Sequence, residues 1–174
     1  NNRKYNTKNN IHTQDAHNEH ISKFGIIGRR GRGHEIGRGW VNHISAKNIQ
    51  TKLGEKIFNK YYKFSVVRNP YDKMVSMYFW AHQQDKQSFN DFCKTSNVNN
   101  LSIHTIDDIC SCDVYFRFEH LHEDIKKVCE YLQLPNYNIN NLPTHKSNTR
   151  KNKKNYREYY DEETRNIVYE SHKK

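Results

Sequence analysis

The 174-residue chain has no apolar run that approaches the ~18 residues of a membrane-spanning helix. Hydrophobic residues make up only 34% of it, against roughly 45–50% in ordinary globular chains. Acidic residues are also few, with 19 Asp and Glu against 29 Lys and Arg, so the formal charge is +10. Aromatic residues are not scarce at 13%, which argues against disorder. Membrane proteins, collagens and coiled coils are therefore excluded, and the charge favours an anionic partner such as nucleic acid, a phosphorylated cofactor, an acidic glycan or a membrane surface.

Cysteine is sparse, and its spacing is a poor signature for a metal site. The four cysteines are Cys93, Cys110, Cys112 and Cys129. The pair Cys110 and Cys112 has no second CxxC pair to complete a zinc site, so we expect no metal. Cys129 falls on the apolar face of a predicted helix and is expected in the core. Four free thiols and a disulfide involving Cys110 or Cys112 both remain open, so cytoplasm and Golgi lumen are both compatible.

The first part of the chain carries little periodic signal. Residues 1–24 are polar and rich in Asn, Lys and His, which predicts a flexible arm preceding a single domain over residues 25–174. Residues 25–39 hold six of the seven glycines and four arginines. This composition predicts a loop and no regular element.

Helical and strand patterns alternate through the rest of the chain, which predicts an α/β fold with a parallel sheet flanked by helices. Ser45 can cap a first helix that ends at Gly54, and the aromatic and β-branched run over 62–67 predicts a buried strand. Residues 97–108 are expected to form a loop. The other predicted elements are a helical turn over 55–60, a helix from Pro70 to about His82, a short helix from Ser88, a strand over 114–118, an amphipathic helix over 121–132 and a last helix from Asp161.

The most informative segment is Lys63-Phe-Ser-Val-Val-Arg68-Asn-Pro70-Tyr-Asp-Lys73-Met-Val-Ser76-Met-Tyr78. It delivers Arg68 at the carboxyl end of a strand, where open parallel sheets bind their ligands. The helix that follows would offer free N–H groups to an anion, and the guanidinium and the Ser76 hydroxyl would add donors for phosphate oxygens. These residues predict a phosphate site. Arg68 could instead pair with a surface carboxylate, and Ser76 could simply fill the helix.

The same segment carries a family resemblance. The pattern Arg-x-Pro-x-x-(Arg/Lys)-x-x-Ser-x-Tyr resembles the 3′-phosphate-binding segment of sulfotransferases that use 3′-phosphoadenosine 5′-phosphosulfate. The residues at these positions are most similar to those of the carbohydrate sulfotransferase branch. The resemblance covers about residues 25–172 and implies a P-loop-like sulfotransferase fold. Further stretches similar to this family are Trp40–Ile49, Phe116–Asp124, Leu142–Ser147 and Tyr156–Thr164.

The resemblance implies roles for individual residues. Arg68 and Ser76 would hold the 3′-phosphate, and Lys146 and Ser147 would close over the cofactor, although solvated surface charge is an equal reading for these two. His43 stands where related glycan sulfotransferases have a general base, a task that suits imidazole because its pKa lies near neutral pH. It could also be an exposed residue at the entry to a helix.

The implied reaction is in-line transfer of a sulfuryl group to a hydroxyl of an acceptor, expected to be a carbohydrate, with no metal required. Lys73 stands where the pattern often has arginine, and no cofactor contact is assigned to it.

One expected part of the family pattern is not found. These sulfotransferases normally begin with a strand and a Pro-Lys-Thr-Gly-type loop for the 5′-phosphosulfate, whereas Gly28-Arg-Arg-Gly31-Arg-Gly33 follows no hydrophobic strand. We therefore expect a fold that is incomplete at its N-terminus, with an inactive nucleotide binder as an alternative. A basic nucleic-acid-binding module is another alternative, because GRRGRG, the run Lys151–Lys154 and the 12 tyrosines suit phosphate contacts and base stacking.

Overall fold

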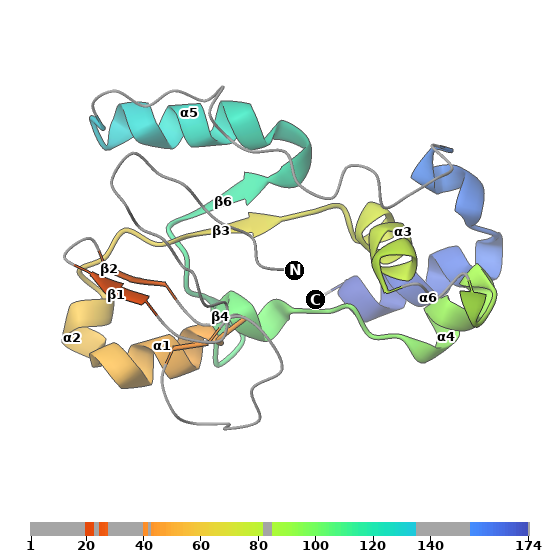
Figure 1. Cartoon of the computed structure of the whole chain (residues 1–174), viewed down its shortest axis with the longest axis horizontal. Coiled ribbons are helices and arrows are strands. Elements are labelled where there is room, and N and C mark those ends of the chain that lie inside the picture. The colour runs from red at the N-terminus through yellow and green to blue at the C-terminus, as the bar shows by residue number, and fades with distance from the viewer. Residues whose placement is uncertain are drawn as a thin grey trace. The chain divides into compact units, whose positions relative to one another are not determined.

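A computed structural model describes residues 20–22, 25–27, 40–41, 43–81, 85–134 and 154–173 (Figure 1). These residues form helices together with short parallel and antiparallel strand pairs, so the chain is of the α/β class. They fall into two compact units, one from residues 1–61 with 102–111 and the other from residues 62–101 with 112–174. The single domain expected over residues 25–174 stays a prediction.

The helices of the first unit begin and end where the sequence predicts. α1 (Ala46–Leu53) is capped by Ser45, whose hydroxyl accepts a hydrogen bond from the Asn48 N–H at 3.2 Å. It ends at Gly54, whose φ of 79° is a conformation that a side chain would strain. α2 (Glu55–Phe58) is the short turn that follows.

A hairpin in the first unit corrects the expected loop over 97–108. β4 (Thr105–Ile106) pairs antiparallel with β5 (Ile109–Cys110), and Asp107 and Asp108 between them both have positive φ, 51° and 63°. Two successive left-handed residues make the tight turn that matches the twist of paired strands, and Asp tolerates this conformation better than most residues. Strands of two residues are too short to show a periodic pattern in the sequence.

A second hairpin lies across the boundary drawn from the sequence at residue 24. β1 (His20–Ser22) pairs antiparallel with β2 (Gly25–Ile27). The prediction that residues 25–39 contain no regular element is therefore wrong for Gly25–Ile27. That prediction rested on composition, and composition does not exclude a strand pair as short as three residues on each side.

The second unit contains the two strands that the sequence predicts. β3 (Phe64–Val67) and β6 (Val114–Arg117) are parallel and in register, from Phe64 opposite Val114 to Val67 opposite Arg117. Parallel pairing places the carboxyl ends of both strands at the same edge (Figure 1). The residues that follow each strand therefore meet there.

Lys63 and Asp113 join the other ends of these strands. The Asp113 carboxylate accepts a hydrogen bond from the Lys63 backbone N–H at 2.6 Å, and the Lys63 ammonium lies 3.1 Å from it. The Asp113 N–H in turn donates to the Lys63 carbonyl at 2.8 Å. The bond from the Lys63 N–H is the main reason that the pKa of Asp113 is lowered. This clamp fixes the register of the sheet.

One face of β3 is more exposed than the sequence predicts. Phe64 and Val66 are 56% and 44% exposed, although the run was expected to be buried. Phe64 stacks on the buried Phe116 of β6 with ring centroids 4.9 Å apart. Alternate residues of a strand point to opposite faces, and an apolar run cannot show whether both faces are covered.

Three helices enclose the core of the second unit and stand together in Figure 1: α3 (Pro70–Trp80), α4 (Phe89–Thr95) and α6 (Glu162–His172). Met74, Val75 and Tyr78 of α3 are buried. The core cluster comprises Met74, Val75, Tyr78, Phe89, Phe92, Cys93, Val98 and Val168.

α5 (Leu121–Tyr131) follows the 3-10 turn η3 (Phe118–His120) and packs beside β6. Cys129, expected in the core, is only half-buried, whereas the charged Asp124 is buried. Asp124 is bound by Arg117 through its backbone N–H at 2.9 Å, Nε at 3.0 Å and Nη2 at 2.8 Å. These bonds make burial of the carboxylate tolerable and hold its pKa far below the usual range.

The described helices have at most 11 residues, and none combines the length and apolarity that crossing a membrane requires. Two further 3-10 turns are η2 (Leu101–Ile103) and η5 (Tyr156–Tyr159).

Candidate anion-binding site

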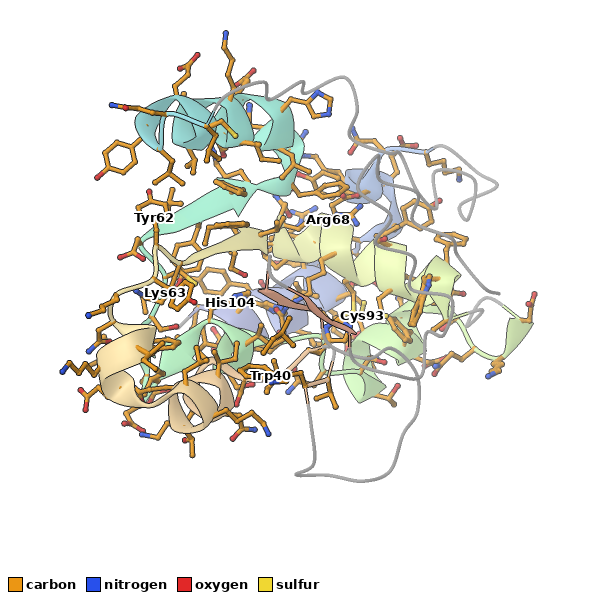
Figure 2. All side chains as sticks on the ribbon, turned by 60° about the vertical axis from the view of Figure 1, so that its left-hand side comes forward. Trp40, Tyr62, Lys63, Arg68, Cys93 and His104 are labelled. Carbon is orange, nitrogen blue, oxygen red and sulfur yellow. The ribbon has the colours of Figure 1, made fainter. Side chains whose placement is uncertain are left out.

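Arg68 and Ser76, the two residues assigned to phosphate binding, contact each other directly. Arg68 follows β3, where the ribbon passes into α3 (Figure 2), and its Nη1 donates a hydrogen bond to Ser76 Oγ at 3.0 Å. Because the guanidinium donates to Ser76 Oγ, the hydroxyl proton remains able to donate elsewhere. The pair thus offers a cation and a neutral donor side by side at the carboxyl end of a parallel strand.

The start of α3 does not offer the free N–H groups that the sequence predicts for anion binding. Pro70 has no N–H, and the Asn69 side chain accepts the N–H groups of Tyr71 at 3.0 Å and Asp72 at 3.4 Å. The N–H of Lys73 donates to the Asn69 carbonyl at 2.9 Å. The cap that starts the helix therefore uses these donors, so side chains must supply the binding groups of this site.

Arg68 has a carboxylate partner, which the sequence left open as the alternative to phosphate binding, and an aromatic partner, which the sequence did not predict. Nε donates to Asp72 Oδ2 at 2.7 Å, and Nη2 lies 2.5 Å from the same oxygen. The guanidinium also stacks on the ring of Phe118, with Cζ 4.4 Å from its centroid. The i, i+4 spacing of Arg68 and Asp72 was a readable signal for this ion pair.

The contact with Phe118 follows from the sheet. Val67 lies opposite Arg117 in the parallel register, so the next residues, Arg68 and Phe118, emerge side by side. Glu119 continues the arrangement, since its Oε1 accepts the backbone N–H of Asn69 at 2.9 Å. The sequence alone indicates no role for Phe118 and Glu119, because only the strand pairing brings them to Arg68.

These contacts leave part of the guanidinium available. Arginine has five N–H donors, of which Asp72 engages those on Nε and Nη2 and Ser76 engages one on Nη1. Among the residues that the structure describes, no acceptor is recorded for the other two. The Arg68 side chain is 27% exposed, so part of it is open to solvent while Asp72 and Phe118 hold the plane of the guanidinium.

Two tyrosines of the segment 154–173 form hydrogen bonds with the start of α3. Asn69 Nδ2 donates to the Tyr156 hydroxyl at 3.4 Å, and the Tyr160 hydroxyl donates to the Tyr71 carbonyl at 2.8 Å. Burial raises the pKa of Tyr160, which keeps this donor protonated. The predicted cofactor residues Lys146 and Ser147 lie outside the described residues.

The structure describes two further residues that the sequence analysis discussed, His43 and Lys73. His43 belongs to the first unit, where it is an exposed turn residue with a φ of 57° shortly before the cap Ser45. Lys73 donates from Nζ to Asn100 Oδ1 at 2.5 Å, and burial lowers its pKa. Lys73 therefore has a different partner from Arg68, although both lie near the start of α3.

All four cysteines are described and are free thiols. Within the described ranges, no three His, Cys, Asp or Glu side chains lie close enough together to hold a metal ion.

A relative of this chain is known by sequence, and its name gives no activity. A protein of Archaeoglobus fulgidus that carries the name "Uncharacterized protein" is 34% identical over an alignment of 97 residues, and the match covers 50% of this chain and 80% of the archaeal protein. The chain belongs to the same family as this archaeal protein. No family model matches the chain, and no solved structure matches it.

Proposed function

We propose that the chain is a sulfotransferase of the P-loop-like fold, which transfers a sulfuryl group from 3′-phosphoadenosine 5′-phosphosulfate to a hydroxyl of a carbohydrate acceptor. The observation that supports this most is the hydrogen bond between Arg68 and Ser76 at the carboxyl end of β3. The two positions come from the motif that resembles the 3′-phosphate segment of these enzymes. Their side chains meet, as holding one phosphate requires.

The residues fit one phosphate group of the nucleotide. Two N–H groups of Arg68 would donate to phosphate oxygens, and the Ser76 hydroxyl would add a third donor. Phe118 and Asp72 would keep the guanidinium in one plane, so little side-chain entropy remains to be lost on binding. The bound nucleotide would supply the sulfuryl group, whose bond to the phosphate oxygen breaks as its bond to the acceptor oxygen forms, releasing adenosine 3′,5′-bisphosphate.

We assign His43 the role of general base. Its imidazole is exposed and would take the proton of the acceptor hydroxyl, which is a weak nucleophile until that proton leaves. Lys146 and Ser147 keep the role that the resemblance implies, contact with the cofactor. A carbohydrate acceptor of negative charge would suit the formal charge of +10.

Calorimetric titration with adenosine 3′,5′-bisphosphate tests the phosphate site. Wild type is expected to bind, and Arg68→Ala to weaken binding at least about tenfold, since one hydrogen bond to a charged group is worth ~1.5–3 kcal/mol. Arg165→Ala, which removes an exposed positive charge from α6, is the matched control and should stay within about twofold. Absence of binding to wild type, or equal loss in both variants, would refute the site.

A transfer assay tests the reaction itself. His43→Ala should abolish transfer of sulfate to a carbohydrate acceptor while leaving bisphosphate binding unchanged, because a base acts only on the acceptor. Bisphosphate binding without transfer in any preparation would favour an inactive nucleotide binder. Tight, steeply salt-dependent RNA binding that Arg68→Ala leaves intact would favour the nucleic-acid module instead.

A further inference from the structure

Arg68 shares its site with a negative charge. Asp72 Oδ2 accepts the hydrogen bond of Arg68 Nε at 2.7 Å and also lies 2.5 Å from Nη2, so one carboxylate oxygen faces two nitrogens of the guanidinium. The two side chains are 27% and 19% exposed. Water therefore screens this pair less than it screens an ion pair on the open surface.

The geometry of α3 places this carboxylate beside any anion at the site. Asp72 and Ser76 are four residues apart and so lie on one helix face, and Arg68 contacts both. An anion held by Arg68 and Ser76 must therefore approach Asp72. Glu119, whose carboxylate binds the Asn69 N–H at 2.9 Å, adds a second negative charge at the start of the helix.

The local balance of charge differs from that of the whole chain. The formal charge of +10 attracts anions over long range, whereas Asp72 neutralises the guanidinium at short range. The N–H groups at the start of α3 cannot compensate, because the Asn69 cap occupies them. An anion at this site thus meets a neutralised arginine and a like charge.

We propose that Asp72 sets an affinity threshold at the anion site. A phosphate whose only contacts are with Arg68 and Ser76 binds too weakly to occupy the site. The inference rests on the proposed function, since it concerns the same phosphate site. Asp72 weakens every phosphate ligand by a similar factor. A nucleotide bisphosphate overcomes this because its other groups make further contacts, whereas inorganic phosphate has none to add.

Asp72→Asn tests the threshold, because it removes the charge and keeps an oxygen that can accept from Arg68. Calorimetry with adenosine 3′,5′-bisphosphate and with inorganic phosphate should show both binding about tenfold tighter than to wild type, a change of about 1.4 kcal/mol. Inorganic phosphate should then compete with the bisphosphate at concentrations that leave wild type unaffected. Glu162→Gln, which removes an exposed negative charge from α6, should change both affinities less than about twofold.

The remaining outcomes separate this inference from the proposed function. If wild type binds the bisphosphate and Asp72→Asn does not tighten it, the threshold is refuted and the phosphate site stands. If Asp72→Asn weakens both ligands, Asp72 positions Arg68 and does not oppose binding, which also refutes the threshold. If wild type binds neither ligand and Asp72→Asn binds neither, the phosphate site itself is refuted. Circular dichroism of each variant verifies that it is folded.

Discussion

Asn69 is the residue whose replacement should most clearly disturb the start of α3. Its side chain accepts the N–H groups of Tyr71 at 3.0 Å and Asp72 at 3.4 Å and donates to the Tyr156 hydroxyl at 3.4 Å. Loss of a helix cap typically costs ~1 kcal/mol. The bond to Tyr156 is long, so we assign it the lower end of the usual range, about 0.5 kcal/mol.

Asn69→Ala should therefore lower the free energy of unfolding by about 1.5 kcal/mol, the sum of these two contributions. For a chain of this size that corresponds to a fall in Tm of about 3–6 °C. Urea unfolding followed by circular dichroism measures the first quantity, and calorimetry measures the second.

Two control variants make the result interpretable. Asn69→Asp keeps an acceptor for the N–H groups of α3 and should stay within about 0.5 kcal/mol of wild type. Ser45→Ala removes the cap of α1, which has one hydrogen bond at 3.2 Å, and should cost about 1 kcal/mol or less. If Asn69→Ala costs no more than Ser45→Ala, or if Asn69→Asp is as damaging as Asn69→Ala, the argument from the cap is wrong.

Three further predictions follow from burial and charge. Met74→Ala should destabilise the chain by ~2–5 kcal/mol in urea unfolding, because it leaves a cavity among residues that are nearly inaccessible to solvent; a cost under about 1 kcal/mol would contradict the packing. Cys110 should react with iodoacetamide long before Cys93, whose pKa burial raises to about 12, as mass spectrometry of timed samples would reveal; equal rates would contradict the burial. Because Arg117 lowers the pKa of Asp124 in the folded state, their contribution to stability is present above the usual Asp pKa of ~3.9 and is lost as pH falls below it. The fall should therefore be shallower in Asp124→Asn, as unfolding measured between neutral and acidic pH would show.

Local chemistry in the sequence predicts where most helices begin. Ser45, Asn69, Ser88 and Asp161 each cap the helix expected after them, because an N-cap is a contact within four residues of chain. The parallel strands were also predicted from their composition, and their pairing agrees with the coarse α/β class.

What the sequence did not predict depends on contacts between distant residues. Phe118 reaches Arg68 only because β3 and β6 pair, and the sequence near either residue does not predict that pairing. The charge of Asp124 predicts an exposed side chain, but three hydrogen bonds from Arg117 allow the carboxylate to be buried. The Asn69 side chain already accepts N–H groups at the start of α3, and only the geometry shows this.

The clamp between Lys63 and Asp113 joins residues 50 positions apart, and the Asn69 to Glu119 bond spans the same interval. A growing polypeptide therefore acquires the Arg68–Ser76 motif, with Asp72, well before it acquires Phe118 and Glu119. α3 and α4 can form while the chain between the strands is still open, but the arginine gains its aromatic support only after β6 has docked. A shortened chain that ended before Phe118 would keep the whole motif and lack the aromatic ring that stacks on Arg68.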